Sequence, residues 1–510
     1  MGIDRRSFLK QSNCAAIGTA SLYSTLFTLR MTAGATTNTS GYKALVCLFL
    51  NGGNDSYNML TPYSQNGWTG YRDARGGVGT NTAGFKDSSL GTGVALDRTA
   101  LSNTVLKDVL GQNYSKYAVH PQLPFLQQQF NNDNLAFVSN VGTMVEPMSI
   151  NDWQNDLKQK PTGLFSHPDA VMHWQTVVPQ IRGATPKGWG GRLADVMTQA
   201  NLNSTVGLNI SLAGNNTLQS GFNSIPYITS PQGAILLHKY AGYDGDPVMK
   251  NAIDSILQGT YPNMFNKTYS GNQKSAVETA ETFGAAISAQ NLYGSVPNTT
   301  INSNNKTADQ LAGVIKILKA RDILGMNRQM FFVNRGGWDH HNELLDSQGG
   351  IAYPNNNNIN DGANGLYYEI NEALEFFWNE LVEEELENDV VLFTVSDFGR
   401  TLTSNGKGTD HAWGGNAFVM GGSSNNGGSL NGGKIYGQYP ELAPNNNPID
   451  LDAHKSQARG RMLPTTSADE YLAELVSWFG LDPAQLSTVF PNCSSFFNPL
   501  ATPHPLGILN

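Results

Sequence analysis

The sequence predicts an α/β fold with a doubly wound, mostly parallel sheet flanked by helices. From residue 306 onward, helical and strand patterns alternate, which is typical of such a sheet. Residues 390–395 form a continuous apolar run, as expected for a strand buried on both faces. Residues 329–334 form a similar run, and an aspartate follows each strand, at Asp339 and Asp397. In open α/β sheets, ligands bind beyond the carboxyl ends of the strands, so the function is expected there.

The other elements follow from the same patterns. Apolar residues at helical spacing predict a helix over residues 307–321 and another over 362–387. Thr-Ser-Ala-Asp-Glu at residues 466–470 has the composition of a helix start. Further strands are expected at 42–50 and 134–141, short β-like runs near 205–212, and further helices at 247–257, 274–293 and 467–479.

The N-terminus has the features of a twin-arginine export signal. Arg5 and Arg6 directly precede Ser-Phe-Leu-Lys, a weakly apolar segment follows, and Ala33-Gly34-Ala35 provides small residues for cleavage. The alternative is an ordinary amphipathic first helix that contains an arginine pair. The apolar segment is too short and too polar to cross a bilayer. We therefore expect a signal at residues 1–35, contact with the twin-arginine export machinery, a periplasmic or secreted location, and no transmembrane segment in the mature chain.

The remaining chain is expected to form one domain. A length of 510 residues gives a prior of about three domains, but α/β proteins often run large as one domain with insertions. We expect a single domain over 36–510, with an insertion at 200–305 that caps the site. The net charge of -9 disfavours nucleic acid and anionic lipid as partners.

Outside the expected signal, the sequence has two cysteines, Cys47 and Cys493. Two cysteines in so long a chain do not make a disulfide scaffold, although one bridge between them is allowed. Cys47 lies inside an apolar strand, where a small buried hydrophobic role is expected.

Polar residues that suit a metal site gather at the predicted strand ends. Mixed carboxylate and imidazole clusters bind divalent ions, with imidazole favouring zinc and carboxylate allowing magnesium, manganese or calcium. Aspartates from several strand ends, two of them followed by histidines, indicate one or two ions that flank a hydroxyl nucleophile and a leaving oxygen. The candidate ligands are Asp55, Asp339, His340, His341, Asp397, Asp410 and His411.

Alternatives remain open for several of these residues. Adjacent side chains leaving a strand point to opposite sides, so at most one of His340 and His341 is expected to bind the ion. Asp55 could instead belong to an ordinary turn after its strand. Arg400 could clamp an anionic substrate oxygen or pair with Asp397 or Asp410.

Tryptophans in glycine-rich loops add a further expectation. Trp189, Trp338 and Trp413 could present aromatic faces to a sugar or lipid headgroup, or pack in the core.

Several motifs, in order from Tyr42 to about Pro491, carry a family resemblance: GGNDSYN, SHPDA, GGWDHHNE, SDFGRTLTSNGKGTDHAWGG, GGKIYGQYP and GRMLPTTSADEYLAELVSWFG. They resemble the DUF1501 family of exported proteins, which is placed in the alkaline phosphatase and sulfatase superfamily. The resemblance implies an α/β sandwich with a two-metal site. That site would catalyse phosphoryl or sulfuryl transfer through a serine, threonine or formylglycine nucleophile.

The resemblance also implies roles for individual residues. In the order of the chain, the superfamily's metal ligands are resembled by Asp55, by Asp339 with His341 or His340, by Asp397, and by His411.

Two departures from the superfamily pattern stand out. Position 398 is phenylalanine, where these hydrolases usually have a metal-binding histidine, so a second ion lacks a ligand unless His340 or Asp410 supplies it. The sequence also lacks the Cys-x-Pro-x-Arg sulfatase signature. Ser166 is then the first choice of nucleophile and Ser56 the second, although Ser166 is equally suited to capping a helix.

Two functions fit these observations. One is an exported metal-dependent hydrolase of phosphate or sulfate esters that acts on a small-molecule or carbohydrate substrate. The other is a non-catalytic exported binding or assembly protein that keeps the scaffold with a degenerate metal site.

Overall fold

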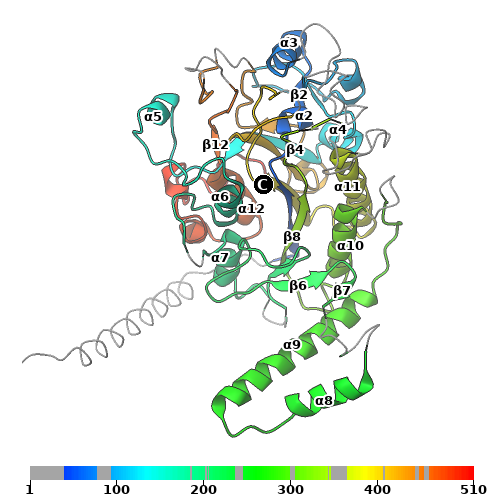
Figure 1. The fold of residues 1–510 in the computed structure, drawn as a ribbon. Helices are drawn as coiled ribbons and strands as arrows, with labels where there is room; N and C mark the ends of the chain where they lie inside the picture. The colour runs from blue at the N-terminus through cyan, green and yellow to red at the C-terminus, as the bar shows by residue number, and fades with distance from the viewer. Residues whose placement is uncertain are drawn as a thin grey trace, which may run out of the picture.

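A ten-stranded mixed sheet forms the centre of the molecule in the computed structural model (Figure 1). The structure describes residues 40–510 apart from 77–92, 184–185, 202–203, 205, 236–239, 241–244, 299–304, 343, 346–364, 406–407, 443–446 and 453–458. The expected export signal at 1–35 therefore lies outside the described residues.

The central strand is β1 (Lys43–Asn51), which pairs in parallel with β8 (Arg328–Gly336) and β9 (Val390–Ser396). Alternate side chains of a strand point to opposite faces, so Leu48 enters one core and Phe49 the other. Both faces are covered, which explains the continuous apolar sequence of these strands. The predicted buried parallel strands are confirmed.

The strand order is β11-β4-β10-β9-β1-β8-β5-β6-β7, with β12 paired to β4. The predicted sheet is confirmed as mostly parallel, but β10 runs antiparallel to β4 and β9. A separate two-stranded sheet pairs β2 with β3. The strands not yet bounded are β2 (Leu60–Pro62), β3 (Tyr117–Val119), β4 (Leu135–Gly142), β5 (Asn209–Ser211), β6 (Tyr227–Ser230), β7 (Gly233–Ala234), β10 (Gly415–Met420), β11 (Ile435–Tyr436) and β12 (Thr466–Ser467).

Helices cover both faces of the sheet (Figure 1). One layer contains α4 (Pro124–Asn131), α10 (Lys306–Lys319) and α11 (Leu366–Glu383). The other contains α6 (His167–Thr176), α7 (Trp189–Val196), α12 (Ala468–Trp478) and α13 (Leu486–Val489). The remaining helical segments are α2 (Ser56–Met59), α3 (Gln65–Ala74), α5 (Ile150–Gln154), α8 (Pro247–Leu257), α9 (Met264–Ser288), and 3-10 turns at Ala100–Thr104, Ser424–Asn426, Pro483–Gln485 and Cys493–Ser495.

The predicted start of α12 is a complete capping box. The Ser467 hydroxyl accepts a hydrogen bond from the Glu470 backbone, and the Glu470 carboxylate accepts one from the Ser467 backbone. These bonds satisfy amide groups that the first turn of a helix leaves without a helical partner.

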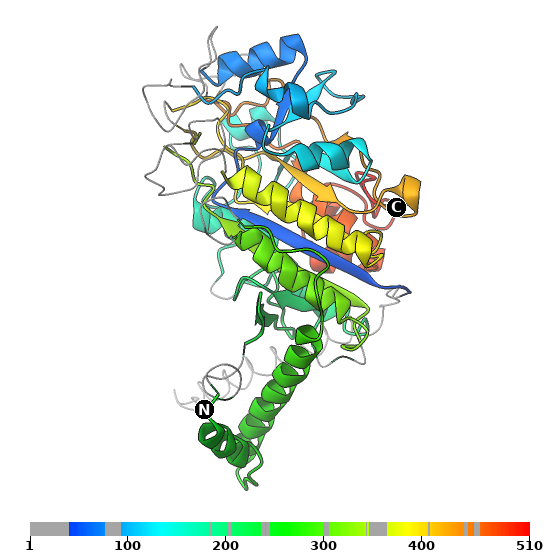
Figure 2. The ribbon, with the colours of Figure 1, turned by 90° about the vertical axis from the view of Figure 1, so that its right-hand side faces the viewer.

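The region 200–305 does not form the expected cap. Its strand β5 is buried in the central sheet, parallel to β8, and β6 and β7 extend the same sheet edge. The described part of the region also contains α8 and α9, a helical hairpin that extends away from the sheet (Figures 1 and 2). The reason is the strand pattern near residue 210, which places this region at the sheet edge rather than over its carboxyl ends.

Two further expectations concern the cysteines and the membrane. Cys47 and Cys493 are both buried free thiols, so the described chain holds no bridge between them. Across the residues with described positions, no helix has the length and apolar character that a bilayer crossing requires.

Candidate metal centre

The carboxyl ends of β1, β8 and β9 meet at one place. The Gly52 backbone N–H donates to Asp397 Oδ1 at 2.9 Å, and the Trp338 N–H donates to the Asn51 carbonyl at 3.3 Å. Gly52 has φ +123, and a Cβ there would lie 2.6 Å from the Asp339 nitrogen. Only glycine lets the β1 and β8 ends approach this closely.

The segment after β9 folds back on itself and delivers two predicted ligands. The Thr401 N–H bonds to the Asp410 carbonyl at 2.9 Å, and the Ala412 N–H bonds to the Gly399 carbonyl at 2.8 Å. This pairing holds Asp410 and His411 beside the end of β8.

Helix α6 brings a third imidazole to the same place. His167 is its first residue, directly after Phe165 and Ser166, and Phe165 adopts a left-handed φ of 74°. The Phe165 carbonyl then accepts a hydrogen bond from His411 Nδ1 at 2.7 Å. Helix α6 is thereby joined to the loop after β9.

Three imidazoles converge on the carboxylate of Asp339. Their Nε2 atoms lie 3.2 Å (His167), 3.2 Å (His341) and 3.4 Å (His411) from its oxygens. The Nε2 atoms of His341 and His411 are only 2.8 Å apart. We call these four residues the metal centre.

The Nδ1 atom of each imidazole faces an outer acceptor. Asp397 Oδ2 accepts from His167 at 2.7 Å, Asp410 Oδ1 accepts from His341 at 3.0 Å, and the Phe165 carbonyl accepts from His411. A neutral imidazole has one N–H, so with that hydrogen on Nδ1 each Nε2 presents a lone pair. Three lone pairs and a carboxylate facing one another require a shared proton or a cation.

Neighbouring charges shift the pKa values of two residues in the centre. Burial would raise the pKa of Asp339, but hydrogen bonds with His411 and Arg400 outweigh it and hold that pKa well below the ordinary range. The hydrogen bond with Asp397 raises the pKa of His167. Asp339 is therefore ionised at neutral pH, and its carboxylate can serve as a ligand.

The residues present fit a divalent ion. His167, Asp339 and His411 each offer a ligand atom within 4.8 Å of the others, and His341 adds a fourth. Three imidazoles and one carboxylate is a donor set that suits zinc. Outer acceptors on the second nitrogen of each imidazole are typical of metal-binding histidines.

The sequence analysis missed His167. Its signal was present in the SHPDA motif, where a histidine follows the expected nucleophile Ser166 at the start of a helix. Of the predicted ligands, the structure brings together Asp339, His341 and His411. Asp397 and Asp410 contact the Nδ1 atoms of His167 and His341, on the far side of each ring from Nε2. They therefore lie around the centre and not within it.

Asp55 and His340 also lie outside the centre. Asp55 is buried and forms an ion pair with Arg75, whose side chain is fully buried. The His340 side chain is buried, and its carbonyl accepts from the Thr409 N–H at 3.0 Å. Adjacent side chains diverge at a strand end, which explains why His341 reaches Asp339 and His340 does not.

Arg400 cannot serve as the expected substrate clamp from this position. Its side chain is fully buried, and it donates to Asp339 Oδ1 at 2.9 Å and to the Thr409 carbonyl at 2.6 Å. The alternative prediction was an ion pair of Arg400 with Asp397 or Asp410, whereas the structure pairs Arg400 with Asp339. Arg400 therefore positions a centre residue.

The two nucleophile candidates differ in position. Ser56 is buried, and its hydroxyl accepts from the Asn416 N–H at 2.9 Å. Ser166 is partly exposed and directly precedes His167. Ser166 is the candidate that borders the centre.

Aromatic side chains near the centre are packed rather than presented. The rings of Phe398 and His411 have centroids 4.4 Å apart, and those of Phe398 and His167 4.8 Å apart. Trp189, Trp338 and Trp413 are all buried, so they belong to the core and offer no face to a sugar or lipid headgroup. A cavity of about 20 Å³ lies beside Phe398, with room for one water.

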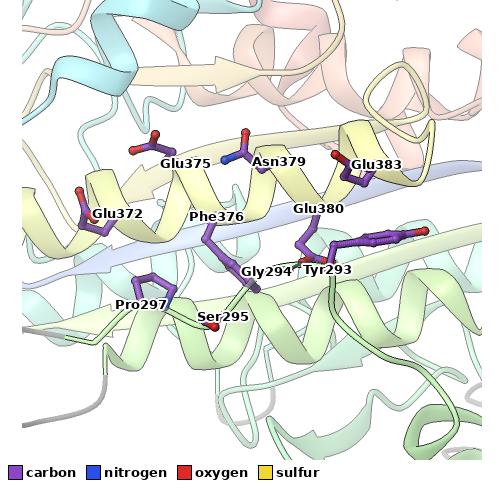
Figure 3. Close-up of a pocket in the computed structure, with 10 residues that line it drawn as sticks. All are labelled: Tyr293, Gly294, Ser295, Pro297, Glu372, Glu375, Phe376, Asn379, Glu380 and Glu383. Carbon is purple, nitrogen blue, oxygen red and sulfur yellow. Dashed lines mark hydrogen bonds between the residues drawn. The ribbon is translucent and has the colours of Figure 1, made fainter.

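A larger cavity of about 460 Å³ lies elsewhere, along α11 (Figure 3). Glutamates line it, including Glu372, Glu375 and Glu383, and it shares no lining residue with the metal centre. We place the chemistry at the centre, because converging bases and perturbed pKa values mark a reactive site better than volume does.

Comparisons with solved structures find remote similarity. The C-terminal periplasmic domain of EcEptC from Escherichia coli, in complex with Zn, is 12% identical, with 90% of this chain and 89% of that chain covered and a TM-score of 0.29. The soluble domain of lipooligosaccharide phosphoethanolamine transferase A from Neisseria meningitidis is 12% identical, with coverage of 92% and 95% and a TM-score of 0.30. A sulfatase from Pseudoalteromonas sp. is 10% identical, with coverage of 84% and 70% and a TM-score of 0.29.

No protein with a curated description matches the sequence. A family model does match, over residues 42–455, which include every residue of the metal centre, and its description is "Protein of unknown function (DUF1501)". The chain therefore belongs to the DUF1501 family, as its motifs predicted.

Proposed function

We propose that the protein is an exported, metal-dependent hydrolase of phosphate or sulfate esters. The observation that carries the proposal is the convergence of three imidazole Nε2 atoms on Asp339, each imidazole being held by an outer acceptor on Nδ1. We assign zinc to this donor set, with His167, Asp339, His341 and His411 as its ligands. Magnesium, manganese and calcium prefer oxygen ligands and suit it less well.

A divalent ion held there would supply Lewis acidity toward an ester oxygen and lower the pKa of a nucleophile. The chain's own residues orient that ion. Asp397, Asp410 and the Phe165 carbonyl fix the three imidazoles, and Arg400 fixes Asp339. The centre is open to substrate, because the side chains of Asp339 and His341 are 43% and 40% exposed.

Ser166 is the proposed nucleophile. It borders His167 at the start of α6, where backbone N–H groups and the helix dipole stabilise an anion. Asp169, in the first turn of the same helix, accepts two hydrogen bonds of 2.6 Å from Arg182.

One ion rather than two is supported by the surroundings. Arg75 neutralises Asp55, which the family resemblance implied as a ligand. Phe398 occupies the position where the superfamily usually has a second histidine ligand, and its ring packs against His167 and His411. A second site would therefore lack both a free carboxylate and an imidazole.

The same two features favour the alternative function. An exported binding or assembly protein could retain one structural ion after losing the second site and its activity. Turnover separates the two proposals, since both allow an ion to bind.

Location is part of the proposal. The twin-arginine pattern at Arg5 and Arg6 supports export of the folded chain to the periplasm or beyond. A small-molecule or carbohydrate ester is the substrate class that this address and the acidic chain favour, whereas nucleic acid is disfavoured.

The test combines metal analysis with a substrate screen. Purified protein should hold one zinc per chain and cleave at least one phosphate or sulfate ester. His411→Ala and Asp339→Ala should lose both ion and turnover, and Ser166→Ala should lose turnover but keep the ion. His504→Ala, at a histidine outside the centre, is the matched control and should keep both. An ion without turnover on any ester would contradict the hydrolase and support the binding protein.

A further inference from the structure

The cavity of about 460 Å³ along α11 lies within the size range of small-molecule sites in proteins. One wall is α11, and the other is the segment of residues 293–297, which follows α9 (Figure 3). The side chains of Phe376 and Glu380 point from the helix toward that segment. The Gly294 N–H donates to Glu380 Oε1 at 2.6 Å, and this hydrogen bond joins the two walls.

The walls of the cavity carry negative charge that the fold does not neutralise. Helix α11 contains five glutamates and no lysine or arginine, and residues 293–297 have no charged side chain. Among the described residues, Lys319 of α10 is the one cation paired with a glutamate of the cavity, at 3.5 Å from Glu380 Oε2. Four glutamates against one lysine leave a net charge of -3. The four glutamates are Glu372, Glu375, Glu380 and Glu383.

A buried carboxylate oxygen shows that this charge is incompletely partnered. The Glu380 side chain is 1% exposed, and its Oε2 atom has no hydrogen-bond partner among the described residues. Burial and the neighbouring Glu372 carboxylate raise the pKa of Glu375. Like charges three or four residues apart on a helix repel each other. A ligand with cationic groups would relieve this repulsion.

The chain itself shows how an ammonium group is held beside this cavity. Lys319 Nζ lies 3.7 Å from the centre of the Tyr293 ring and 3.2 Å from Glu384 Oε1. It also donates to the Asn291 carbonyl at 2.7 Å. Aromatic faces and carboxylates both attract ammonium ions. Phe376 and three further glutamates line the cavity, so the same kinds of group are available to a ligand.

The spacing of the carboxylates distinguishes between kinds of cation. Glu372, Glu375 and Glu383 follow one another along α11, and at about 1.5 Å of rise per residue the first and last lie about 16 Å apart (Figure 3). A metal ion needs ligand atoms that converge on one point. Within the described part of the chain, the only such group of three or more is at the metal centre. A row of separate carboxylates instead matches a linear molecule with several ammonium groups.

We propose that the cavity along α11 binds a linear polyamine. Its ammonium groups would contact Glu372, Glu375 and Glu383, and its methylene chain would lie against Phe376. A basic peptide is a poorer ligand, because a hollow of this volume suits a small molecule. The cavity shares no lining residue with the metal centre, so the proposal holds whether or not the centre hydrolyses esters.

Isothermal titration calorimetry with spermidine tests the proposal on the purified full chain. Wild type should bind one spermidine per chain and should bind methylamine far more weakly. The double variant Glu372→Gln with Glu375→Gln should bind spermidine roughly tenfold more weakly. The matched control is Glu278→Gln with Glu281→Gln, which removes two glutamates at the same spacing on α9, outside the cavity. It should bind like wild type.

A further variant and a measurement on wild type complete the test. Ser295→Arg keeps the four glutamates but places a cation of the chain in the cavity, so spermidine binding should be lost. Spermidine should also raise the unfolding temperature of wild type. Equal binding by the two double variants, unchanged binding by Ser295→Arg, or an unchanged unfolding temperature would overturn the proposal. So would tighter binding of calcium or of a pentalysine peptide than of spermidine, since a metal ion or a basic protein would then be the ligand.

Discussion

At the scale of single residues, the metal centre depends on the partner that holds each imidazole. A carboxylate that accepts the Nδ1 hydrogen fixes the tautomer and the ring orientation of a histidine ligand. Asp397 does this for His167 and Asp410 for His341, at 2.7 and 3.0 Å. Their importance therefore lies in orienting ligands, although the sequence suggested that they bind the ion themselves.

Replacing these carboxylates should weaken metal binding without abolishing it. Asp397→Asn and Asp410→Asn each leave the four centre residues in place but weaken the hydrogen bond to the Nδ1 atom of one imidazole. We expect zinc affinity to fall roughly 10- to 100-fold in each, measured by competition with a chromophoric chelator. If the affinity stays at the wild-type value, the outer partners have no role in binding. Complete loss of zinc would indicate instead that these aspartates are ligands.

His173 gives a prediction on pH and stability. It is buried in α6, and burial lowers its pKa to about 4. Between the unfolded pKa near 6.5 and this folded value, only the unfolded chain binds the proton. Stability from this group is therefore full above about pH 6.5 and lost as the pH falls toward 4, by about 3 kcal/mol. Urea unfolding should show a shallower pH dependence for His173→Gln than for wild type over that range, and identical slopes would contradict the assignment.

Sequence patterns identified some site residues and could not identify others. Asp339, His341 and His411 follow strands or glycine-rich loops, so their position in the chain already pointed to the rim of the sheet. His167 comes from a helix start more than 170 residues before Asp339, and only the folded chain shows their Nε2–Oδ2 contact of 3.2 Å. The roles of Asp55 and Arg400 could not be predicted, because both side chains are buried in ion pairs that only the fold forms. Asp55 pairs with Arg75, and Arg400 pairs with Asp339.

At the scale of elements, a buried ion pair joins the start of α2 to the end of α3. Asp55 precedes α2, Arg75 follows α3, and both side chains are almost completely buried. Burial raises the pKa of Asp55, and this effect outweighs the opposing effects of Arg75 and Arg400. The Asp55 carboxylate therefore relies on its contact with Arg75 to remain charged. The family resemblance implied Asp55 as a metal ligand, whereas the structure pairs it with Arg75.

Breaking the pair from one side should be costly. Arg75→Ala leaves a carboxylate buried without its partner, and we expect the free energy of unfolding to fall by about 3–5 kcal/mol in urea titration. Replacing both residues, as Asp55→Leu with Arg75→Met, removes the unpaired charge and should cost much less. A double variant as unstable as Arg75→Ala would show that packing, not the stranded charge, sets the loss.

The elements themselves followed from periodicity. Strands 42–50, 329–334 and 390–395 appear as β1, β8 and β9, each within three residues of the predicted ends. Helix α8 has the predicted bounds, and α9 begins ten residues earlier than expected, because its exposed first turns lack an apolar stripe. The antiparallel course of β10 was not predictable, since a buried run reads alike in either direction.

At the scale of the whole molecule, the ion should stabilise the fold. Its four proposed ligands come from α6, the loop after β8 and the loop after β9, so a bound ion joins segments far apart in the chain. At a free zinc concentration of 1,000 times Kd, the free energy of unfolding should rise by about 4 kcal/mol. Calorimetry with zinc and with a chelator should show this for wild type and for His504→Ala, but not for His167→Ala. A stabilisation retained in His167→Ala would place the ion elsewhere.

X-ray absorption spectroscopy of the zinc-loaded protein counts the imidazole ligands on the ion. We predict one zinc per chain, with three imidazole nitrogens at about 2.0–2.1 Å and one carboxylate oxygen. His167→Ala should lower the imidazole count to two or release the ion. A spectrum dominated by oxygen ligands, or two zinc ions at full occupancy, would contradict this prediction.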